Sequence, residues 1–438
     1  LWSLDTFVSM TLIDYYYNIV GYPNYYFLLI PLSITRFTLP FLMPLLGFLS
    51  DRNYFFTRGH GRRFLWILVS GLLLPLLFLL SYIEPIEPAS IFEPIDPSFV
   101  MLYTIIYFLY NLFYVLYSTT LSALVLNKFR SPKERTLLAG VLGTLSTVSA
   151  LIIPVFVPYI EFLSLDLTSF RVSLVAFALI FIVTLTIGIF GLLEEQGLKD
   201  TYLSRNQAPK EWFLKDFFKR FSIFGRKNFL VLLIRYIAFA LLNLLFLNNI
   251  HYFWEYVLNE HYPSYVFYSL LYLIGIPHGF LLAWFKGHLK IVIVTGFIMG
   301  ALLIGFFFVA EITMAIILIS IIGFVFGFML PSLLPLQGDV FDEYAHKKRK
   351  RSEGFGYGML GTFGSFVALV ATFSVYDLPG FEYGWGPQPP SVVMGIRIIT
   401  TLIPGIILII VMIIFTLVYD LKPEKTEAIR MELKELEI

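Results

Sequence analysis

Cysteine is absent from the 438 residues of this chain, so disulfide bonds and thiolate metal sites are excluded. Charge is scarce as well: Asp, Glu, Lys and Arg make up 14% of the residues, whereas about a quarter is usual for a soluble domain. The six histidines are scattered and form no metal-binding pattern. The net charge of +1 gives no sign of a nucleic-acid partner. The sequence therefore predicts neither a metal site nor a cofactor.

Hydrophobic residues account for 58% of the chain and aromatic residues for 18%, and the mean hydropathy is +0.80. Apolar stretches of roughly 20 residues, long enough to cross a bilayer, recur throughout. Runs of this length without period-2 alternation satisfy their backbone amides as helices. We expect an all-α membrane protein with twelve transmembrane helices in two six-helix bundles, with spans at 1–20, 25–50, 64–83, 99–126, 137–160, 169–193, 228–258, 264–285, 289–309, 311–336, 354–377 and 392–419.

Lysine and arginine mark one side of the membrane. All but four of the 31 fall in every second connection or in the C-terminal tail. The connections on the other side, around 21–24, 84–98, 259–263 and 378–391, contain none. The positive-inside rule therefore predicts that both termini face the cytoplasm, and we expect a multi-pass protein of the plasma membrane.

Four regions follow from this pattern: an N-terminal bundle over 1–193, a cytoplasmic central loop over 194–227, a C-terminal bundle over 228–419 and a cytoplasmic tail over 420–438. Residues 211–221 place aromatics at helical spacing among basic residues, which is typical of a helix on the inner membrane surface. A cytosolic connector packed on the bundle is the alternative. The expected partners are the lipid bilayer and a small-molecule substrate, and we expect a monomer.

The connection after the second span carries a compact charged motif. Residues 47–52 read Gly-Phe-Leu-Ser-Asp-Arg, and residues 61–63 read Gly-Arg-Arg. A glycine at the end of a span lets another helix approach closely, and an acid beside several arginines can form charge-assisted hydrogen bonds. Such a latch, broken and remade, suits a protein that alternates between two packings. In the simpler interpretation, the arginines only anchor the loop inside.

This motif resembles the loop 2–3 signature of the major facilitator superfamily, and its insertion resembles the glycoside–pentoside–hexuronide branch, which includes melibiose permease and is similar to the plant sucrose transporters. Segments 15–21, 122–136 and 338–354 are similar to that branch in the same order. The resemblance covers essentially the whole chain and implies sugar or glycoside transport by alternating access. It also implies a conformational-switch role for Gly47, Asp51, Arg52, Gly61, Arg62, Arg63, Glu134, Arg135, Asp339, Asp342 and Glu353.

The resemblance does not extend to the cation and sugar sites of that branch. Leu39 and Met43 occupy the positions of its two cation-binding acids. The charged positions of its fourth, fifth and eleventh helices fall on Ser118, Gly143 and Ser365. Proton coupling is therefore expected in place of sodium coupling, and facilitated diffusion is the alternative.

Ionisable side chains at bilayer depth are the remaining candidates for a binding site, because charge there is costly. Arg36 can pair with Asp5 or Asp14 and leave the other acid to bind a proton or substrate. A fixed ion pair between the first two helices is the alternative.

The seventh span is rich in polar residues. Asn248, His251 and Glu255 are spaced i, i+3, i+7 and would share one face of a regular helix. One interpretation is that this face lines an outer vestibule. The alternative is that it is the polar end of the span, within an aromatic belt at the membrane interface. The substrate and coupling candidates are Asp5, Asp14, Arg36, Asn111, Tyr114, Asn243, Asn248, His251 and Glu255.

A secondary transporter is thus the leading interpretation, and no nucleotide-binding loop suggests direct use of ATP. A transporter of an amphiphilic or lipid-like solute, or a non-transporting subunit that keeps the fold, are the alternatives. An enzyme is not expected, because no nucleophile or metal arrangement is found.

Overall fold

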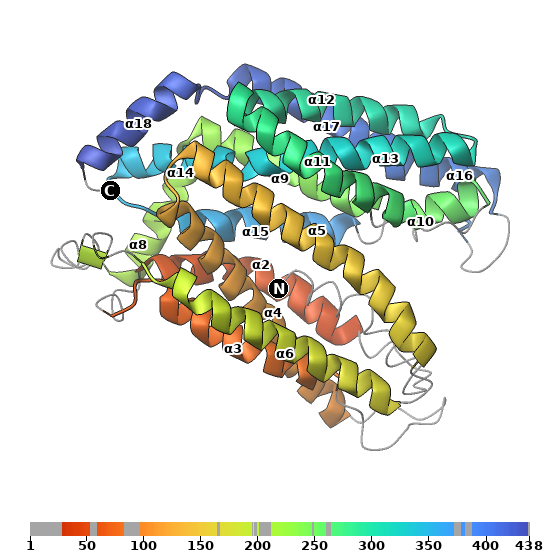
Figure 1. The fold of residues 1–438 in the computed structure, drawn as a ribbon, viewed down its shortest axis with the longest axis horizontal. Coiled ribbons are helices and arrows are strands. Elements are labelled where there is room, and N and C mark those ends of the chain that lie inside the picture. Colours follow the sequence, from red (N-terminus) through yellow and green to blue (C-terminus); the bar gives the residue numbers. More distant parts are fainter. Residues whose placement is uncertain are drawn as a thin grey trace. The chain divides into compact units, whose positions relative to one another are not determined.

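The computed structural model describes residues 29–52, 59–82, 97–163, 167–194, 196, 199–200, 212–247, 249–259, 264–371, 378–381 and 388–436. Every regular element in this part of the chain is a helix, as expected (Figure 1). Seven of the described helices are long and apolar enough to cross a membrane. The predicted first span lies outside the described residues.

The helices of the first half follow the predicted spans and extend beyond several of them. They are α2 (Leu29–Arg52), α3 (Phe64–Leu80), α4 (Pro97–Lys128), α5 (Pro132–Leu163) and α6 (Leu167–Leu192), followed by the short α8 (Phe213–Arg220). The start of α5 is set by a reciprocal cap. Ser131 Oγ accepts from the Glu134 backbone N–H at 3.1 Å, and the Glu134 carboxylate accepts from the Ser131 N–H at 3.2 Å.

The second half begins with α9 (Lys227–Leu242), which continues through two π turns. The elements in order are η4 (Asn243–Leu247), α10 (Ile250–Tyr252), η5 (Phe253–Val257), α11 (Ser264–Lys286), α12 (His288–Phe307), α13 (Ile312–Met329), η6 (Leu330–Ser332), α14 (Leu333–Lys348), α15 (Glu353–Ala371), α16 (Pro390–Arg397), η7 (Ile398–Leu402), α17 (Ile403–Val418) and α18 (Pro423–Glu435). The tail thus contains one short helix, α18.

The chain divides into two compact units. Unit 1 comprises residues 1–128, 148–217 and 353–362, and unit 2 comprises 129–147, 218–352 and 363–438. The start of α15 therefore packs in unit 1 and the start of α5 in unit 2. The predicted boundaries of the two bundles, which follow the chain without interleaving, stay a prediction.

Unit 1 has an aromatic-rich core between α3, α4 and α6. Leu74 and Phe78 of α3 pack with Tyr103 and Tyr110 of α4 and with Phe181 of α6, and all five side chains are buried. The phenolic oxygens of both tyrosines are buried without a hydrogen-bond partner in the described residues, but each tyrosine makes further contacts. In this unit, apolar packing positions α3 and therefore the loop that leads into it.

Unit 2 relies on glycine for its closest helix pair. Gly275 and Gly279 of α11 face Gly323 and Gly327 of α13, and a methyl group at any of the four would overlap a backbone carbonyl of the other helix. Small residues at such positions let two helices gain van der Waals contact inside a membrane. Figure 1 shows α11 and α13 side by side.

The same device brings α2 and α15 together in unit 1. Side chains at Gly47 or Gly354 would overlap the backbone of the facing glycine, and one at Gly358 would overlap the carbonyl oxygen of Met43. One turn further along, Thr362 Oγ1 donates to the carbonyl oxygen of Pro40 at 2.7 Å. The carbonyl oxygen of Pro40 is free to accept this hydrogen bond because its helical donor would be residue 44, which is also a proline and has no N–H. The end of α2 is therefore in backbone contact with the start of α15.

Substitution Gly47→Ala should lower the stability of the protein by about 1–3 kcal/mol, because the methyl group forces the two backbones apart. The matched control is Gly188→Ala on α6, where an added methyl group meets nothing within 4 Å. The control should change stability by no more than about 1 kcal/mol, in the stabilising direction. Thermal unfolding of both variants in detergent measures the difference, and equal midpoints would contradict the packing described for α2 and α15.

Candidate functional site

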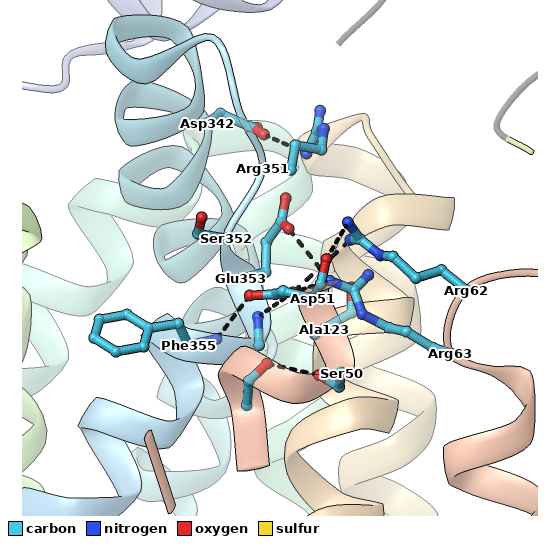
Figure 2. A network of polar contacts seen from close by, with 12 residues as sticks. Ser50, Asp51, Arg62, Arg63, Ala123, Asp342, Arg351, Ser352, Glu353 and Phe355 are labelled. Atoms are coloured by element: carbon cyan, nitrogen blue, oxygen red, sulfur yellow. Dashed lines mark hydrogen bonds and ion pairs between the residues drawn. The ribbon is translucent and has the colours of Figure 1, made fainter. Parts of the chain in front are cut away.

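The carboxylate of Asp51, in the last turn of α2, caps the N-terminus of α15. The backbone N–H of Gly354 donates to Oδ1 at 3.1 Å, and that of Phe355 donates to Oδ2 at 2.9 Å (Figure 2). The first N–H groups of a helix lack partners within it, and together they carry a partial positive charge. Asp51 satisfies two of these donors and places a full negative charge beside them.

Arg63 binds the same carboxylate. Its Nη2 lies 2.7 Å from Asp51 Oδ1 and 3.4 Å from Glu353 Oε2, and its Nη1 donates to the carbonyl oxygen of Ala123 at 3.0 Å. Exposure of Asp51 and Arg63 is 0%, and that of Glu353 is 1%. One arginine thus links the end of α2, the start of α15 and the backbone of α4.

Arg62 completes this set, which we call the Asp51 network (Asp51, Arg62, Arg63 and Glu353). Arg62 Nη1 donates to the backbone carbonyl of Asp51 at 3.0 Å, and its backbone N–H donates to Glu194 at 3.1 Å. Gly61 has a φ of 116°, which favours glycine, and any side chain there would collide with Glu194.

Arg52 contributes differently. Its guanidinium carbon lies 5.4 Å from the ring centroid of Phe213 and 5.8 Å from that of Phe48. The contact is a cation–π interaction between the end of α2 and the short helix α8. Arg52 therefore ties the central loop to unit 1.

A buried network of this kind is stable only while all its members are paired. Removing a charged group from water costs several kcal/mol, and hydrogen bonds offset that cost only when they are complete. Both oxygens of Asp51 have partners in this packing. If the helices separate, water must reach each ion. The arrangement can therefore hold two helix ends together firmly and still have a hydrated, open alternative.

A second network lies in unit 2. Arg135, in the first turn of α5, donates from Nη1 to Asp342 Oδ2 at 2.8 Å, and Arg351 Nη1 donates to Asp342 Oδ1 at 3.3 Å. Arg135 Nε also donates to the carbonyl oxygen of Phe129 at 2.7 Å. A side chain at Gly338 would overlap the guanidinium of Arg135. We call Arg135, Asp342 and Arg351 the Asp342 network, and it has the same Gly-x-x-x-Asp spacing as Gly47 and Asp51.

The tail helix α18 joins this second network. Arg430 pairs with Asp339, and His288 Nε2 lies 2.8 Å from Asp339 Oδ2, which accepts a hydrogen bond when that ring nitrogen carries the proton. On the exposed side, His346 Nε2 lies 2.6 Å from Glu432. These contacts fasten α18 to α14 and α12.

Asp420, just before α18, joins the ends of three elements. Burial opposes its ionisation, but hydrogen bonds from Lys227, Asn228 and Lys425 outweigh that effect and hold the pKa of Asp420 below its usual range. Asn228 also donates to Glu343 at 2.8 Å. The start of α9, the end of α17 and α18 are thus connected at one point.

The predicted substrate site is only partly visible. Asp5, Asp14 and Asn248 lie outside the described residues, and Arg36 is exposed on α2. The proposed pairing of Arg36 with an acid of the first span therefore stays a prediction.

Three other candidates lie on regular or π-helical backbone. Asn111 Nδ2 donates to the Tyr107 carbonyl oxygen at 2.9 Å, and Asn243 Nδ2 donates to that of Phe239 at 2.7 Å. Tyr114 is half-buried beside the apolar side chains of α2 and α4. The two amides thus donate to their own helix, one turn back.

The seventh span is not the regular α-helix on which the predicted shared face of Asn248, His251 and Glu255 depended. The π turns η4 and η5 and a break at Asn249 interrupt it, so an i, i+3, i+7 pattern no longer defines one face. His251 is exposed with its ring against that of Tyr252, and Glu255 is half-buried. Isolated π turns are frequent at functional sites because they displace side chains from regular positions.

Arg235 was not among the candidates, and the structure gives it more weight than the sequence did. It is 4% exposed on α9, and its Nε and Nη2 are buried with no hydrogen-bond partner among the described residues. Its guanidinium carbon lies 5.9 Å from the ring centroid of Phe239. A signal was available, since Arg235 is one of the four cations outside the basic connections. An underpartnered arginine inside a span is a functional candidate.

The positions of the lost cation-binding acids are filled with apolar contacts. Leu39 and Met43 of α2 are buried against Val115 of α4, with Phe108 and Leu112 packed around them. Metal cations such as those bound in this position prefer carboxylate and carbonyl oxygens as ligands. This apolar cluster has no carboxylate, so it does not suit a metal cation.

A family model described as "MFS/sugar transport protein" matches residues 3–422, nearly the whole chain. The chain belongs to this family of the major facilitator superfamily. The family is one of membrane transporters and not of enzymes, so the predicted function class and the resemblance drawn from the loop motifs are confirmed. No curated protein sequence matches the chain.

Two solved structures are similar over almost their full length. The proton:xylose symporter XylE, bound to 6-bromo-6-deoxy-D-glucose, shares 14% identity at a TM-score of 0.62, covering 98% of this chain and 95% of that one. The E. coli fucose:proton symporter FucP shares 12% identity at a TM-score of 0.58, covering 95% of each chain. At such identities the likeness concerns the fold, and it confirms the major facilitator fold, with which the predicted twelve helices agree.

In this family member, Asp51→Asn should destabilise the protein by about 3 kcal/mol, because Arg63 would keep its buried charge with Glu353 as its only acid partner in the Asp51 network. The control is Glu432→Gln, which removes a 57% exposed partner of His346 and should cost less than about 1 kcal/mol. Thermal unfolding in detergent compares the two. A loss for Asp51→Asn as small as that of the control would contradict the importance given to the Asp51 network.

Proposed function

We propose that this protein is a secondary active transporter that moves a sugar or glycoside across the plasma membrane by alternating access, coupled to protons. Family membership supports the substrate class. The observation that carries the mechanism is the contact of Asp51 with both Arg63 and the start of α15. The two structural neighbours are described as proton symporters of xylose and fucose, which makes protons the natural first choice of coupling ion.

In this mechanism the two networks are the reversible bonds of the conformational cycle. Each joins residues that are far apart along the chain: Asp51 with Gly354 and Phe355, and Arg135 with Asp342. While the bonds are formed, the connected helix ends stay together and close a route to the substrate. When they break, the ions become hydrated and the helix ends separate. Alternating access needs two discrete packings of this kind.

The charge distribution supports a cytoplasmic position for both networks. They lie in the connections that hold almost all the lysines and arginines, so the positive-inside rule assigns them, the central loop and both termini to the cytoplasm. The described packing is then the one in which the cytoplasmic ends of the joined helices are closed.

The substrate and coupling residues belong to spans of both halves. Arg235 has two buried N–H donors to offer to sugar hydroxyls, and the π turns beside it bring Asn243 and Glu255 out of regular helical register. Glu255, His251 and the acids of the first span are the candidates for the proton.

An amphiphilic solute is the second candidate. The apolar cluster of Leu39, Met43 and Val115 favours it, because this cluster occupies the region where the resemblance implied a charged cation site. A solute with an alkyl or aryl portion would gain from such a surface.

The test is thermal unfolding of the purified protein against sugars, glycosides and lysolipids at two pH values. A ligand at about 100 times its dissociation constant should stabilise the protein by roughly 2.7 kcal/mol. We expect a hexose, pentose or glycoside to do so, and Arg235→Gln to remove that effect while Arg235→Lys retains part of it. Stabilisation by lysolipids alone would favour the amphiphile, and no response to any compound would contradict transport of either class.

A sugar that passes this test is then assayed in proteoliposomes with and without a pH gradient. Uptake accelerated by the gradient supports proton coupling. Uptake that is indifferent to the gradient would overturn the coupling and leave facilitated diffusion.

A further inference from the structure

A cavity of about 740 Å³ lies within unit 2, next to the Asp342 network. Its walls are the first turn of α5, the turn between α11 and α12, and one face of α18. A volume of this size accommodates a metabolite or a lipid headgroup. Its lining includes Asp342 and Arg351 of the Asp342 network and Glu134 of the switch motifs, but the proposed transport cycle assigns no ligand to the cavity.

Positive charge prevails in the lining. Five lysines and arginines contribute to it, together with His288, against three acids. Two of the three acids are already engaged: Glu134 caps the start of α5, and Asp342 is held by Arg135 and Arg351. The basic residues of the lining are Arg130, Lys133, Arg351, Arg430 and Lys434.

Two of these cations lack a carboxylate among the described residues. Lys133 is exposed at the start of α5, and its Nζ lies 5.1 Å from the ring centroid of Trp284 on α11. Lys434 is exposed on the last turns of α18 and has no ion pair within the described chain. A third cation, Arg430, is already engaged with two acids: its Nη2 pairs with Asp339, and its Nε lies 3.8 Å from Asp342 Oδ2.

The lining also offers a flat apolar surface. The Trp284 ring is 37% exposed and contributes to the cavity, next to the buried side chains of Ala283 and Leu433. An indole face packs well against the CH face of a sugar ring or a planar base, and the aromatic side chain with its neighbouring cation favours a ligand that carries both a ring and a negative charge.

We propose that this cavity binds an organic phosphate, with the phosphate group near Lys133, Lys434 and Arg430 and the attached ring or polyol on Trp284. Phosphate suits the site because its oxygens accept several charge-assisted hydrogen bonds at once. The same chemistry can come from a soluble sugar phosphate or from the headgroup of an anionic phospholipid.

Occupation of the cavity would affect the conformational cycle, and this part rests on the proposed function. The ligand would bridge α5, α11 and α18 in the packing in which Arg135 binds Asp342. A ligand that binds one packing better than another shifts the population toward it. The phosphate would therefore hold the Asp342 network closed and slow transport from the side on which the phosphate accumulates.

Binding is measured on the full-length protein by calorimetry, with glucose 6-phosphate, inorganic phosphate and glucose as probes. A second arm uses nanodiscs of phosphatidylcholine with and without phosphatidylglycerol. The test variant is Lys133→Gln/Lys434→Gln, which leaves the Asp342 network intact. The control is Lys348→Gln/Lys422→Gln, which removes the same charge from two exposed lysines that are not in the lining.

We expect glucose 6-phosphate to bind more tightly than inorganic phosphate, glucose not to bind to this site, and the test variant to bind at least about tenfold more weakly than the control. Saturation of the site in phosphatidylglycerol nanodiscs, with loss of the soluble probe, would support the phosphate site and identify a lipid as its occupant.

No binding in either arm, or equal binding by both variants, would overturn the proposal. Sugar uptake by the same samples separates the two ideas: intact uptake without phosphate binding defeats only this inference, and phosphate binding without uptake defeats only the proposed function.

Discussion

The structure depends on one buried carboxylate more than on any other group. Asp51 receives two backbone N–H groups from the start of α15 and the guanidinium of Arg63, and its exposure is 0%. Three different elements thus meet at a single side chain. Because an unpaired charge in that place would be costly, α15 must begin where it does, and the loop before α3 must present Arg63 to the same point. The close approach of Gly47 and Gly354 makes this geometry possible, since any larger residue would hold the carboxylate away from the helix end.

The Asp342 network follows the same physical logic with different partners. Gly338 leaves room for the guanidinium of Arg135, and Asp342, one turn later, binds it. Here an arginine from the first turn of α5 takes the place that backbone N–H groups hold at Asp51. Both networks use a small residue to admit a partner and an acid to bind it. Neither needs a large apolar interface, which is what allows such a contact to be both specific and reversible.

Much of the fold and of the Asp51 network could be predicted from the sequence. Contacts between segments far apart along the chain could not. The hydrophobic runs indicated the helices, but α5 begins at Pro132, before the predicted span at 137, because Ser131 and Glu134 cap it. The proximity of Asp51 to Arg62 and Arg63 was predicted, because only a short loop separates them. That Asp51 would also cap α15, 303 residues from Gly354, could not be derived, since nothing local in the sequence links the two segments.

The interior site was harder to predict for a different reason. The spacing of Asn248, His251 and Glu255 indicates one helix face only if the helix is regular, and π turns have no strong sequence signature. Arg235 was overlooked because composition alone does not tell a paired cation from an unpaired one. Only the three-dimensional structure shows that Arg235 is buried and that two of its N–H donors have no hydrogen-bond partner among the described residues.

The central claim is that the contact between Asp51 and the start of α15 opens and closes during transport. Ser50, beside Asp51, is 0% exposed and lies under the start of α15. Because the chain has no cysteine, Ser50→Cys introduces a single thiol, whose rate of labelling by a water-soluble maleimide reports opening directly. We expect slow labelling of Ser50→Cys at rest and faster labelling when a transported sugar is added. In the double variant Ser50→Cys/Asp51→Asn, we expect fast labelling even without sugar. A labelling rate that responds neither to the sugar nor to Asp51→Asn would contradict the central claim.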